Sequence, residues 1–418
     1  MTPAHVEAEK SSRSAAVSRT PFLIPGFRTA AAACGMRYRD RLDLALIVAD
    51  SPQGATASGV FTKNRFTAAP VTLCRERLEA HRAGAVLVNA GIANACTGEE
   101  GLVRAREMTG AAAKALGIDP ETVLAASTGV IGMQLQTACV FDAMPRLAEK
   151  LSPEGWADTA RAIMTTDTVP KMASVKVEID GKTITVGGIA KGSGMIAPNM
   201  ATMLAFVCTD AAVEPHVLDY YVKQGAGRSF NAITVDGDTS TNDTLLVLAG
   251  GAAGNAVLSD VDSRGSRIFG EALEAVFLDL AKRIVVDGEG ATKLIEVVVE
   301  EAADPASART IAFAIANSPL VKTAFFGEDA NWGRIVCAAG RSGVALNAET
   351  ASLFFDDICV FKDGQPLSGP EIEEKASAVF RQKEIRVRLS LGMGGHSFTA
   401  YTCDFSFDYV KINASYRS

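Results

Sequence analysis

The chain has 418 residues, of which 48% are hydrophobic and 21% are charged, a composition close to that of an ordinary globular protein. Its 41 basic and 48 acidic side chains leave a formal net charge of −7, so no basic excess is available to neutralise nucleic-acid phosphates. No apolar run approaches the roughly 20 residues that a membrane helix needs. We therefore expect partners that are neither nucleic acid nor membrane.

The N-terminus and the cysteines indicate the cellular compartment. The first twenty residues lack the apolar core of a secretory signal, and we expect residues 1–24 to form a flexible N-terminal extension. The eight cysteines are scattered without a CxxC pair, which is typical of reduced thiols in a cytoplasmic protein. The four histidines are isolated as well, so the sequence predicts no metal site.

Short apolar runs bounded by glycine, aspartate or asparagine predict strands. In chain order, these runs are 44–48, 85–88, 175–179, 183–186, 203–207, 245–248, 295–299, 311–315, 335–336, 358–361 and 385–389. Apolar residues at helical spacing predict helices over 101–116, 156–164 and 269–285. This mixture predicts an α/β (α+β) protein in which layered sheets are covered by helices.

The segment KGSGMIAPNMATMLAF, residues 191–206, carries the most distinctive chemistry. Its glycines permit unusual backbone conformations, Pro198 favours a turn, and Thr202 opens a buried apolar run. If the bond between Ala201 and Thr202 were cut, the Thr202 hydroxyl would lie beside its own α-amino group. That amine has a pKa of about 7.7–8.0 and can act as the general base. The residues alone leave open a glycine-rich turn whose threonine only binds the backbone.

Four other segments are polar and rich in glycine, serine or threonine. ASTGVIG, residues 126–132, could direct backbone N–H groups at one point, as an oxyanion hole requires. SFNAITVDGDTSTNDT, residues 229–244, has alternating calcium-type ligands but lacks the EF-hand glycine and glutamate, so a turn is expected. DGEGATK, residues 287–293, lacks the spacing of a phosphate loop. TTDTVPK, residues 165–171, carries no generic motif.

Taken together, these segments resemble the ornithine acetyltransferase (glutamate N-acetyltransferase, ArgJ) family. KGSGMIAPNMATML closely resembles the self-cleavage motif of that family, and the resemblance extends from residue 25 to the end of the chain. It includes, in the same order, GVFTKNR (59–65), VNAGIANACTG (88–98), STGVIG (127–132), TTDTVPK, SFNAITVDGDTSTNDT, DGEGATK, FGEDANWGRI (326–335) and DYVKINASYRS (408–418).

The resemblance implies a DmpA/ArgJ-like fold and a specific activity. The precursor is expected to cut itself between Ala201 and Thr202 into an α chain and a β chain, which correspond to residues 25–201, preceded by the extension, and 202–418. The two chains stay intertwined and form a heterotetramer of two α and two β chains. The enzyme would move acetyl from N-acetylornithine to glutamate by a ping-pong mechanism in arginine biosynthesis. The resemblance implies no cofactor. Some members of the family also accept acetyl-CoA as an acetyl donor, so it is a candidate second donor for this chain.

The same resemblance implies the roles of individual residues. Thr202 is the expected nucleophile, and Thr128 with Gly129 forms the expected oxyanion hole. The residues expected to contact substrate, besides Thr202, are Thr166 (favoured over Thr165), Lys191, Glu289, Asn413 and Ser418. We hypothesise that Glu289 pairs with a substrate ammonium and Lys191 with a carboxylate, while Asn413 and Ser418 supply neutral hydrogen bonds.

Two other hypotheses about the function are compatible with the sequence. One is a related N-terminal nucleophile aminopeptidase or amidase, which shares self-cleavage but hydrolyses its substrate. The other is a non-catalytic metabolite-binding homologue that keeps the fold. An uncut chain without acetyl transfer would favour the second hypothesis, and transfer of the acyl group to water would favour the first.

Overall fold

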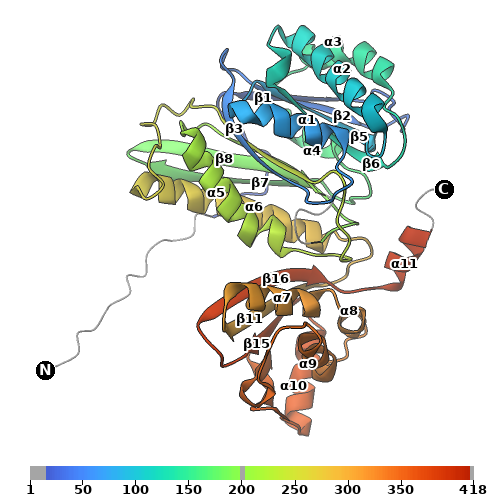
Figure 1. Cartoon of the computed structure of the whole chain (residues 1–418), viewed down its shortest axis with the longest axis vertical. Coiled ribbons are helices and arrows are strands. Elements are labelled where there is room, and N and C mark those ends of the chain that lie inside the picture. The colour runs from blue at the N-terminus through green and yellow to red at the C-terminus, as the bar shows by residue number, and fades with distance from the viewer. Residues whose placement is uncertain (1–15, 198–202, 415–418) are drawn as a thin grey trace, which may run out of the picture.

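The computed structural model of the protein describes residues 16–197 and 203–414, and Figure 1 shows the path of the chain. Three β-sheets with their covering helices make up the described part of the chain. The first two sheets pack against each other, and the third lies toward the opposite end of the molecule. This architecture confirms the prediction of layered sheets covered by helices.

The first sheet has the strand order β1-β2-β5-β6. Its strands are β1 (Phe27–Ala32), β2 (Leu44–Ala49), β5 (Ala85–Ile92) and β6 (Val123–Val130). The pairs β1–β2 and β2–β5 are antiparallel, whereas β5 and β6 are parallel. Helices α2 (Gly98–Leu116) and α3 (Thr137–Glu149) cover the outer face, where Leu46, Leu87 and Met108 share one core, and α1 (Ala69–Arg77) packs against β6 and α2.

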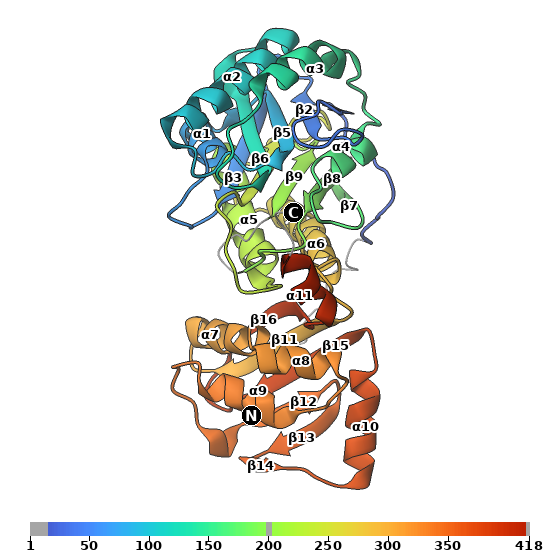
Figure 2. The same ribbon diagram turned by 90° about the vertical axis from the view of Figure 1, so that its right-hand side faces the viewer.

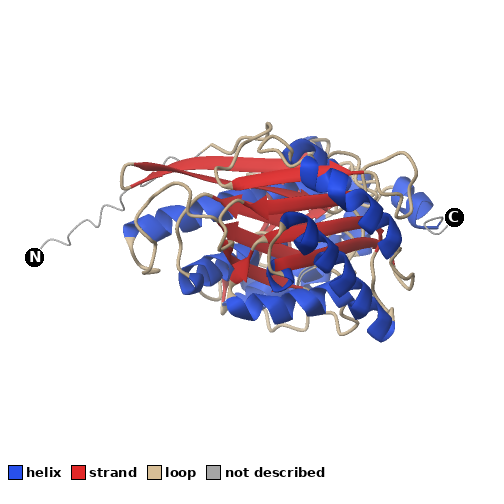
Figure 3. Cartoon of the chain, turned by 90° about the horizontal axis from the view of Figure 1, so that it is seen from above, coloured by secondary structure: helices blue, strands red, loops and turns tan. Residues whose placement is uncertain are grey.

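The second sheet has the order β4-β3-β10-β9-β8-β7. Its strands are β3 (Ala55–Phe61), β4 (Arg82–Ala83), β7 (Lys171–Ile179), β8 (Lys182–Lys191), β9 (Leu204–Thr209) and β10 (Thr244–Ala249). One face packs on the first sheet, with Val86 and Phe206 in the shared core together with Trp156 of α4 (Trp156–Ala162). Helices α5 (Pro215–Arg228) and α6 (Arg264–Val286) cover the other face (Figure 1). Figure 3 shows the helices and strands of the molecule from above.

The third sheet has the order β14-β13-β12-β15-β11-β16. Its strands are β11 (Leu294–Ala302), β12 (Ser352–Phe355), β13 (Ile358–Lys362), β14 (Gln365–Pro366), β15 (Glu384–Ser390) and β16 (His396–Cys403). The accompanying helices are α7 (Pro305–Ala316), α8 (Pro319–Phe326), α9 (Trp332–Gly340) and α10 (Pro370–Phe380). The last helix, α11 (Phe407–Ala414), lies where the upper and lower parts of the molecule meet (Figure 2). Short 3₁₀ turns occur at Leu78–Ala80, Pro120–Thr122, Phe230–Ala232 and Ala348–Thr350.

Two predicted strands were wrong. Residues 311–315 lie in α7 and residues 335–336 lie in α9. In α7 the Asp304 carboxylate caps the helix by accepting from the Ser307 N–H, Pro305 occupies the first turn, and the buried residues follow helical spacing. A short apolar run fits a buried helix as well as a strand, and the capping residues outside the run decide between them.

The first described residues contact the body of the protein. Ser18 pairs with Ser174 of β7, and the Arg19 guanidinium lies 2.6 Å from the Asp279 carboxylate. The Phe22 ring lies against Trp156, with 5.1 Å between ring centroids. These contacts fix residues 18–22 to the body, although the sequence analysis placed them in the flexible extension. Separately, none of the described helices has the length and apolarity to span a membrane.

The second sheet also joins the two sides of the predicted cleavage point. Strands β3, β4, β7 and β8 precede residue 201, whereas β9 and β10 follow residue 202. Strand β9 is an interior strand, because it pairs with β8 on one side and with β10 on the other. Residues 198–202, which include Ala201 and Thr202, lie outside the described residues, as does Ser418.

Candidate active site

A cavity of about 230 Å³ lies at the ends of elements drawn from the first two sheets and from α11. Its lining residues come from the ends of β5, β6 and β8 and the residues that follow them, from the loops before β7 and β10, from the segment after α6 and from α11. They are Ala93, Thr128, Gly129, Val130, Ile131, Thr165, Thr166, Lys191, Gly194, Met195, Ser240, Asn242, Glu289 and Asn413.

The wall built by Thr128 and Gly129 depends on a close approach between two backbones. Gly129 lies opposite Gly91 in the β5–β6 ladder and has a φ of 129°, which favours glycine. A Cβ on Gly129 would lie 2.2 Å from the carbonyl carbon of Gly91. Only a residue without a side chain fits there, which explains why a glycine follows Thr128 at the cavity.

Lys191 brings a positive charge to the end of β8. Its side chain is only 2% exposed, and its Nζ donates to the hydroxyls of Thr165 at 2.9 Å and Thr128 at 3.3 Å. Burial lowers the pKa of Lys191, and the Asp167 carboxylate, 4.0 Å from Nζ, opposes that effect. The cation therefore depends on a nearby carboxylate to remain charged.

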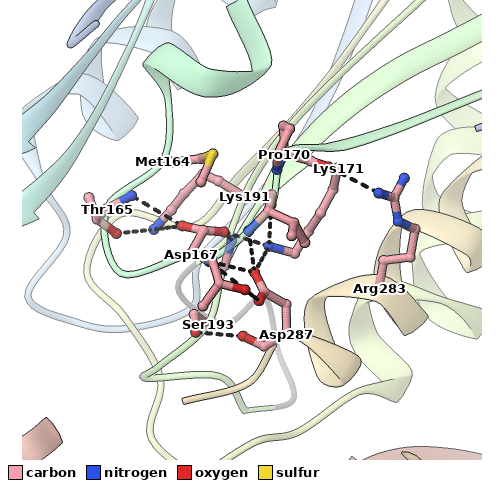
Figure 4. Close-up of polar contacts among 12 residues, drawn as sticks. Met164, Thr165, Asp167, Pro170, Lys171, Lys191, Ser193, Arg283 and Asp287 are labelled. Atoms are coloured by element: carbon pink, nitrogen blue, oxygen red, sulfur yellow. Dashed lines mark hydrogen bonds and ion pairs between the residues drawn. The ribbon is translucent and has the colours of Figure 1, made fainter. Parts of the chain in front are cut away.

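A buried ionic network lies directly behind Lys191 (Figure 4). The Lys171 ammonium donates to Asp167 at 2.7 Å and to Asp287 at 2.6 Å, and it has no exposed side-chain surface. The Ser193 hydroxyl donates to the Asp287 carbonyl at 2.6 Å. Burial raises the pKa of Asp167, but Lys191 and Lys171 outweigh burial and bring that pKa down to about 2.

Glu289 brings a negative charge to the same cavity. Its backbone N–H donates to the Ser193 carbonyl at 3.0 Å, and its Oε2 accepts from the Asn413 side-chain amide at 2.9 Å. Gly194 leaves the space for the carboxylate, because a Cβ there would lie 2.4 Å from the Glu289 carboxyl carbon. The cavity thus contains an ammonium from β8 and a carboxylate from the segment after α6.

The described residues on either side of residues 198–202 are held in place. Asp236 accepts from the backbone N–H groups of Met195 at 2.6 Å and Ile196 at 2.9 Å, and burial raises the pKa of its carboxyl to about 6. On the other side, the Met203 N–H donates to the buried Asp243 carboxylate at 3.2 Å, and burial raises the pKa of Asp243. Both flanks are therefore anchored to the polar segment 229–244.

The ArgJ family model matches residues 28–418. The chain belongs to the ArgJ family. It is 49% identical over 395 residues to the arginine biosynthesis bifunctional protein ArgJ of Geobacter sulfurreducens, covering 94% of this chain and 100% of that protein. It is 51% identical over 376 residues to the protein of the same name from Symbiobacterium thermophilum, covering 90% and 92%.

Two solved structures match parts of the chain. The crystal structure of arginine biosynthesis bifunctional protein ArgJ from Bacillus halodurans is 43% identical, with a TM-score of 0.48, covering 50% of this chain and 97% of that one. The structure of ornithine acetyltransferase complexed with ornithine from Mycobacterium tuberculosis is 33% identical, with a TM-score of 0.41, covering 45% and 99%.

The structure brings together six of the residues that the ArgJ resemblance singled out. The residues that line the one cavity are Thr128, Gly129, Thr166, Lys191, Glu289 and Asn413. Thr165 lines it as well, and its hydroxyl contacts Lys191, so the first two threonines of the TTDT segment are both available to a ligand. The predicted Ala201, Thr202 and Ser418 lie outside the described residues.

Sequence reasoning missed the residues that support this ArgJ-family site. Asp167 and Lys171 were seen only as part of TTDTVPK, because a spacing of four indicates a side-chain pair only on a helix, and these residues lie in a loop and at the start of a strand. Asn242 was considered only as part of a calcium-type alternation, yet its side-chain amide donates to the carbonyls of Ala93 at 2.6 Å and Ser127 at 2.9 Å. It therefore braces the cavity wall next to Thr128.

Proposed function

We propose that this ArgJ-family chain is a self-cleaving acetyltransferase of arginine biosynthesis, which moves acetyl from N-acetylornithine to glutamate. The observation that carries the proposal is the single cavity that contains the Thr128–Gly129 pair together with the opposite charges of Lys191 and Glu289. The sequence relatives named above are arginine biosynthesis bifunctional proteins, which supports the same pathway.

The size and charge of the cavity suit an acetylated amino acid. Its 230 Å³ is below the roughly 300–1,000 Å³ of pockets for drug-sized ligands, so a smaller molecule is expected. We propose that Glu289 pairs with the ammonium that both substrates carry, and that Lys191 binds a carboxylate. The amides of Asn413 and the hydroxyl of Ser418 would orient the ligand without adding charge.

Self-cleavage would generate the nucleophile. The Thr202 hydroxyl attacks the Ala201 carbonyl, the peptide bond breaks as an ester forms, and water hydrolyses that ester to leave Thr202 with a free α-amine. The described structure supports this step, since Ile196 on one side and Met203 on the other are each anchored by their own carboxyl group, Asp236 and Asp243. The cut chains 1–201 and 202–418 would stay together through the β8–β9 and β3–β10 ladders.

The acetyl group would then move in two steps. The α-amine of Thr202 takes the hydroxyl proton as the oxygen attacks the acetyl carbonyl, and the proton passes to the departing ornithine nitrogen as the C–N bond breaks. The glutamate ammonium next loses a proton to solvent, and the neutral amine attacks the acetyl ester. The Thr202 α-amine takes a second proton from the attacking nitrogen and passes it to the threonine oxygen as the ester C–O bond breaks and N-acetylglutamate leaves. The Gly129 N–H and the Thr128 hydroxyl would stabilise the oxyanion in both steps, and the loss of one such donor typically costs about 10²–10³ in rate.

The proposal also covers the assembly, the cellular location and the cofactor use of the enzyme. We propose a heterotetramer of two α and two β chains in the cytoplasm, which acts without a cofactor. Acetyl-CoA is proposed as a second acetyl donor. Native mass spectrometry of the purified protein tests the assembly, and replacement of N-acetylornithine by acetyl-CoA in the assay tests the donor.

The deciding experiment combines intact-mass analysis with isotope transfer. Denatured protein should give two fragments that match residues 1–201 and 202–418, and deuterated acetyl from N-acetylornithine should appear on glutamate. Omission of glutamate should leave the acetyl on the fragment that begins at residue 202. Thr202→Ala should remain uncut and inactive. A single uncut species in the wild type without transfer would refute the proposal, and release of free acetate with no labelled acetylglutamate would favour a hydrolase.

A further inference from the structure

We infer that Asp167 is a positioning residue for acetyl transfer, which holds the Lys191 ammonium and the two backbone segments beside it in the arrangement that binds the substrate carboxylate. The inference rests on the proposed function, because it assigns a role in the recognition of an acetylated amino acid. Asp167 does not line the cavity, so it acts through Lys191 and its neighbours.

The contacts of Asp167 join three parts of the site (Figure 4). Its Oδ1 accepts from the Gly192 N–H at 2.7 Å, at the point where β8 ends and the glycine-rich segment begins. Its Oδ2 accepts from the Thr165 N–H at 3.1 Å and lies 4.0 Å from the Lys191 Nζ. One carboxylate therefore fixes the loop that carries Thr165, the turn after Lys191 and the Lys191 cation itself.

The positive charge of Lys171 offsets the negative charge of the buried Asp167 carboxylate. It pairs with both Asp167 and Asp287, and the Asp167 side chain has no exposed surface. The loss of one partner of a buried pair usually leaves an uncompensated charge. If Asp167 became neutral, however, Lys171 would keep Asp287 at 2.6 Å, so an asparagine at residue 167 is compatible with folding.

Lys191 would respond most to the change. The charged groups that face it are Asp167 from the loop before β7, Lys171 from β7, Glu289 from the segment after α6 and Asp243 from the loop before β10. Among the three carboxyl groups, only Asp167 lies within 4.0 Å of the ammonium. Burial already lowers the pKa of Lys191, and removal of the carboxylate that opposes burial lowers it further. Lys191 would then lose its proton at a lower pH.

The test is the pH profile of kcat/KM for glutamate in Asp167→Asn. We expect its basic limb to move to lower pH by about 1–3 units, the usual effect of an opposite charge at this range. The KM for glutamate should rise more than kcat falls. Asp210→Asn is the matched control, because Asp210 is also a buried carboxylate that accepts a backbone N–H, from Thr185 at 2.7 Å, at the far end of β9. This control should leave the basic limb in place.

Two further measurements separate the possible failures. Titration of the Lys191 ¹³Cε resonance, which is assigned by its loss in Lys191→Arg, reports the pKa of Lys191 without an activity assay. A wild-type protein that transfers no acetyl would therefore refute the proposed function, but this titration could still be made. Asp167→Glu covers the case in which the asparagine variant does not fold. It keeps the charge but displaces it, so the KM for glutamate should rise while the basic limb stays. An unmoved limb and resonance in Asp167→Asn, an equal shift in Asp210→Asn, or an unchanged KM in Asp167→Glu would overturn the inference.

Discussion

The absence of a side chain at Gly194 creates the space that the Glu289 carboxylate occupies. A Cβ at residue 194 would lie 2.4 Å from both the carboxyl carbon and Oε2 of Glu289, far inside van der Waals contact. Gly194 is not among the glycines with a positive φ, so the backbone itself accepts alanine. Gly194→Ala should therefore displace the negative charge of the cavity without removing it.

The cost of this displacement follows from the contacts that it breaks. The carboxylate must leave the position where Oε2 accepts from Asn413 at 2.9 Å. The displaced carboxylate would also lose the ligand ammonium that it is proposed to bind, and a hydrogen bond to a charged group contributes about 1.5–3 kcal/mol. At about 1.4 kcal/mol for each factor of ten, the kcat/KM for N-acetylornithine should fall about 10- to 150-fold.

Steady-state kinetics, intact-mass analysis and thermal unfolding should be measured together on the Gly194→Ala protein. The matched control is Gly227→Ala in α5, where a Cβ would have no neighbour within 4 Å. Alanine is favoured over glycine in a helix by up to about 1 kcal/mol, so the control should be as stable as the wild type or more stable, with unchanged kinetics.

In Gly194→Ala we expect a loss of kcat/KM without a loss of cleavage or folding. Gly194→Ala should still be cut and should unfold near the wild-type temperature, because the side chain that must move faces a cavity. Wild-type kcat/KM in Gly194→Ala would show that the Glu289 carboxylate is not where the ligand ammonium binds. An equal loss in the glycine control would show that the effect is not local.

Three other changes test different parts of the site. Glu289→Gln should raise the KM or lower kcat/KM while cleavage proceeds, as intact mass and kinetics will show, and an uncut variant would instead assign Glu289 to maturation or structure. Gly129→Ala should lower the melting temperature and abolish transfer, because its Cβ would lie 2.2 Å from the Gly91 carbonyl carbon, and a stable, active variant would contradict that geometry. Burial raises the pKa of Asp236 in the folded protein to about 6, whereas an aspartate in the unfolded chain has a pKa of about 3.9. Between these pH values the folded protein holds a proton that the unfolded chain has released, so the free energy of unfolding should fall as the pH rises. Urea unfolding at several pH values should show a flatter dependence in Asp236→Asn, and an unchanged slope would mean that this carboxyl is ionised throughout.

Six strands of the stacked sheets could be predicted from short apolar runs, whereas β1, β3, β4 and β6 were not predicted. LALIV became β2 and LLVL became β10, both entirely buried. The same rule failed for IAFAI in α7, where the run itself is ambiguous and the caps at Asp304 and Pro305 determine a helix. Local patterns report burial more directly than they report which backbone conformation achieves it.

The residues that line the cavity could be predicted only through the resemblance of their motifs. Nothing local to DGEGATK indicates that Glu289 faces Lys191, which is 98 residues earlier in the chain. The supporting residues could not be predicted at all. Asp167, Lys171 and Asp287 form one network only after β7, β8 and the end of α6 have packed together, so their roles follow from tertiary structure.

The distribution of the site along the chain constrains the order of maturation. Thr128, Gly129 and Lys191 precede the proposed cut, whereas Glu289 and Asn413 follow it. Strand β9, which begins just after the cut, is flanked by β8 from the earlier segment and by β10, which in turn pairs with β3. A separate chain ending at residue 201 would expose the unpaired edges of β3 and β8, and such edges promote aggregation. Under the proposed mechanism, the whole chain must therefore fold before it is cut, and the cavity is assembled before Thr202 gains its free α-amine.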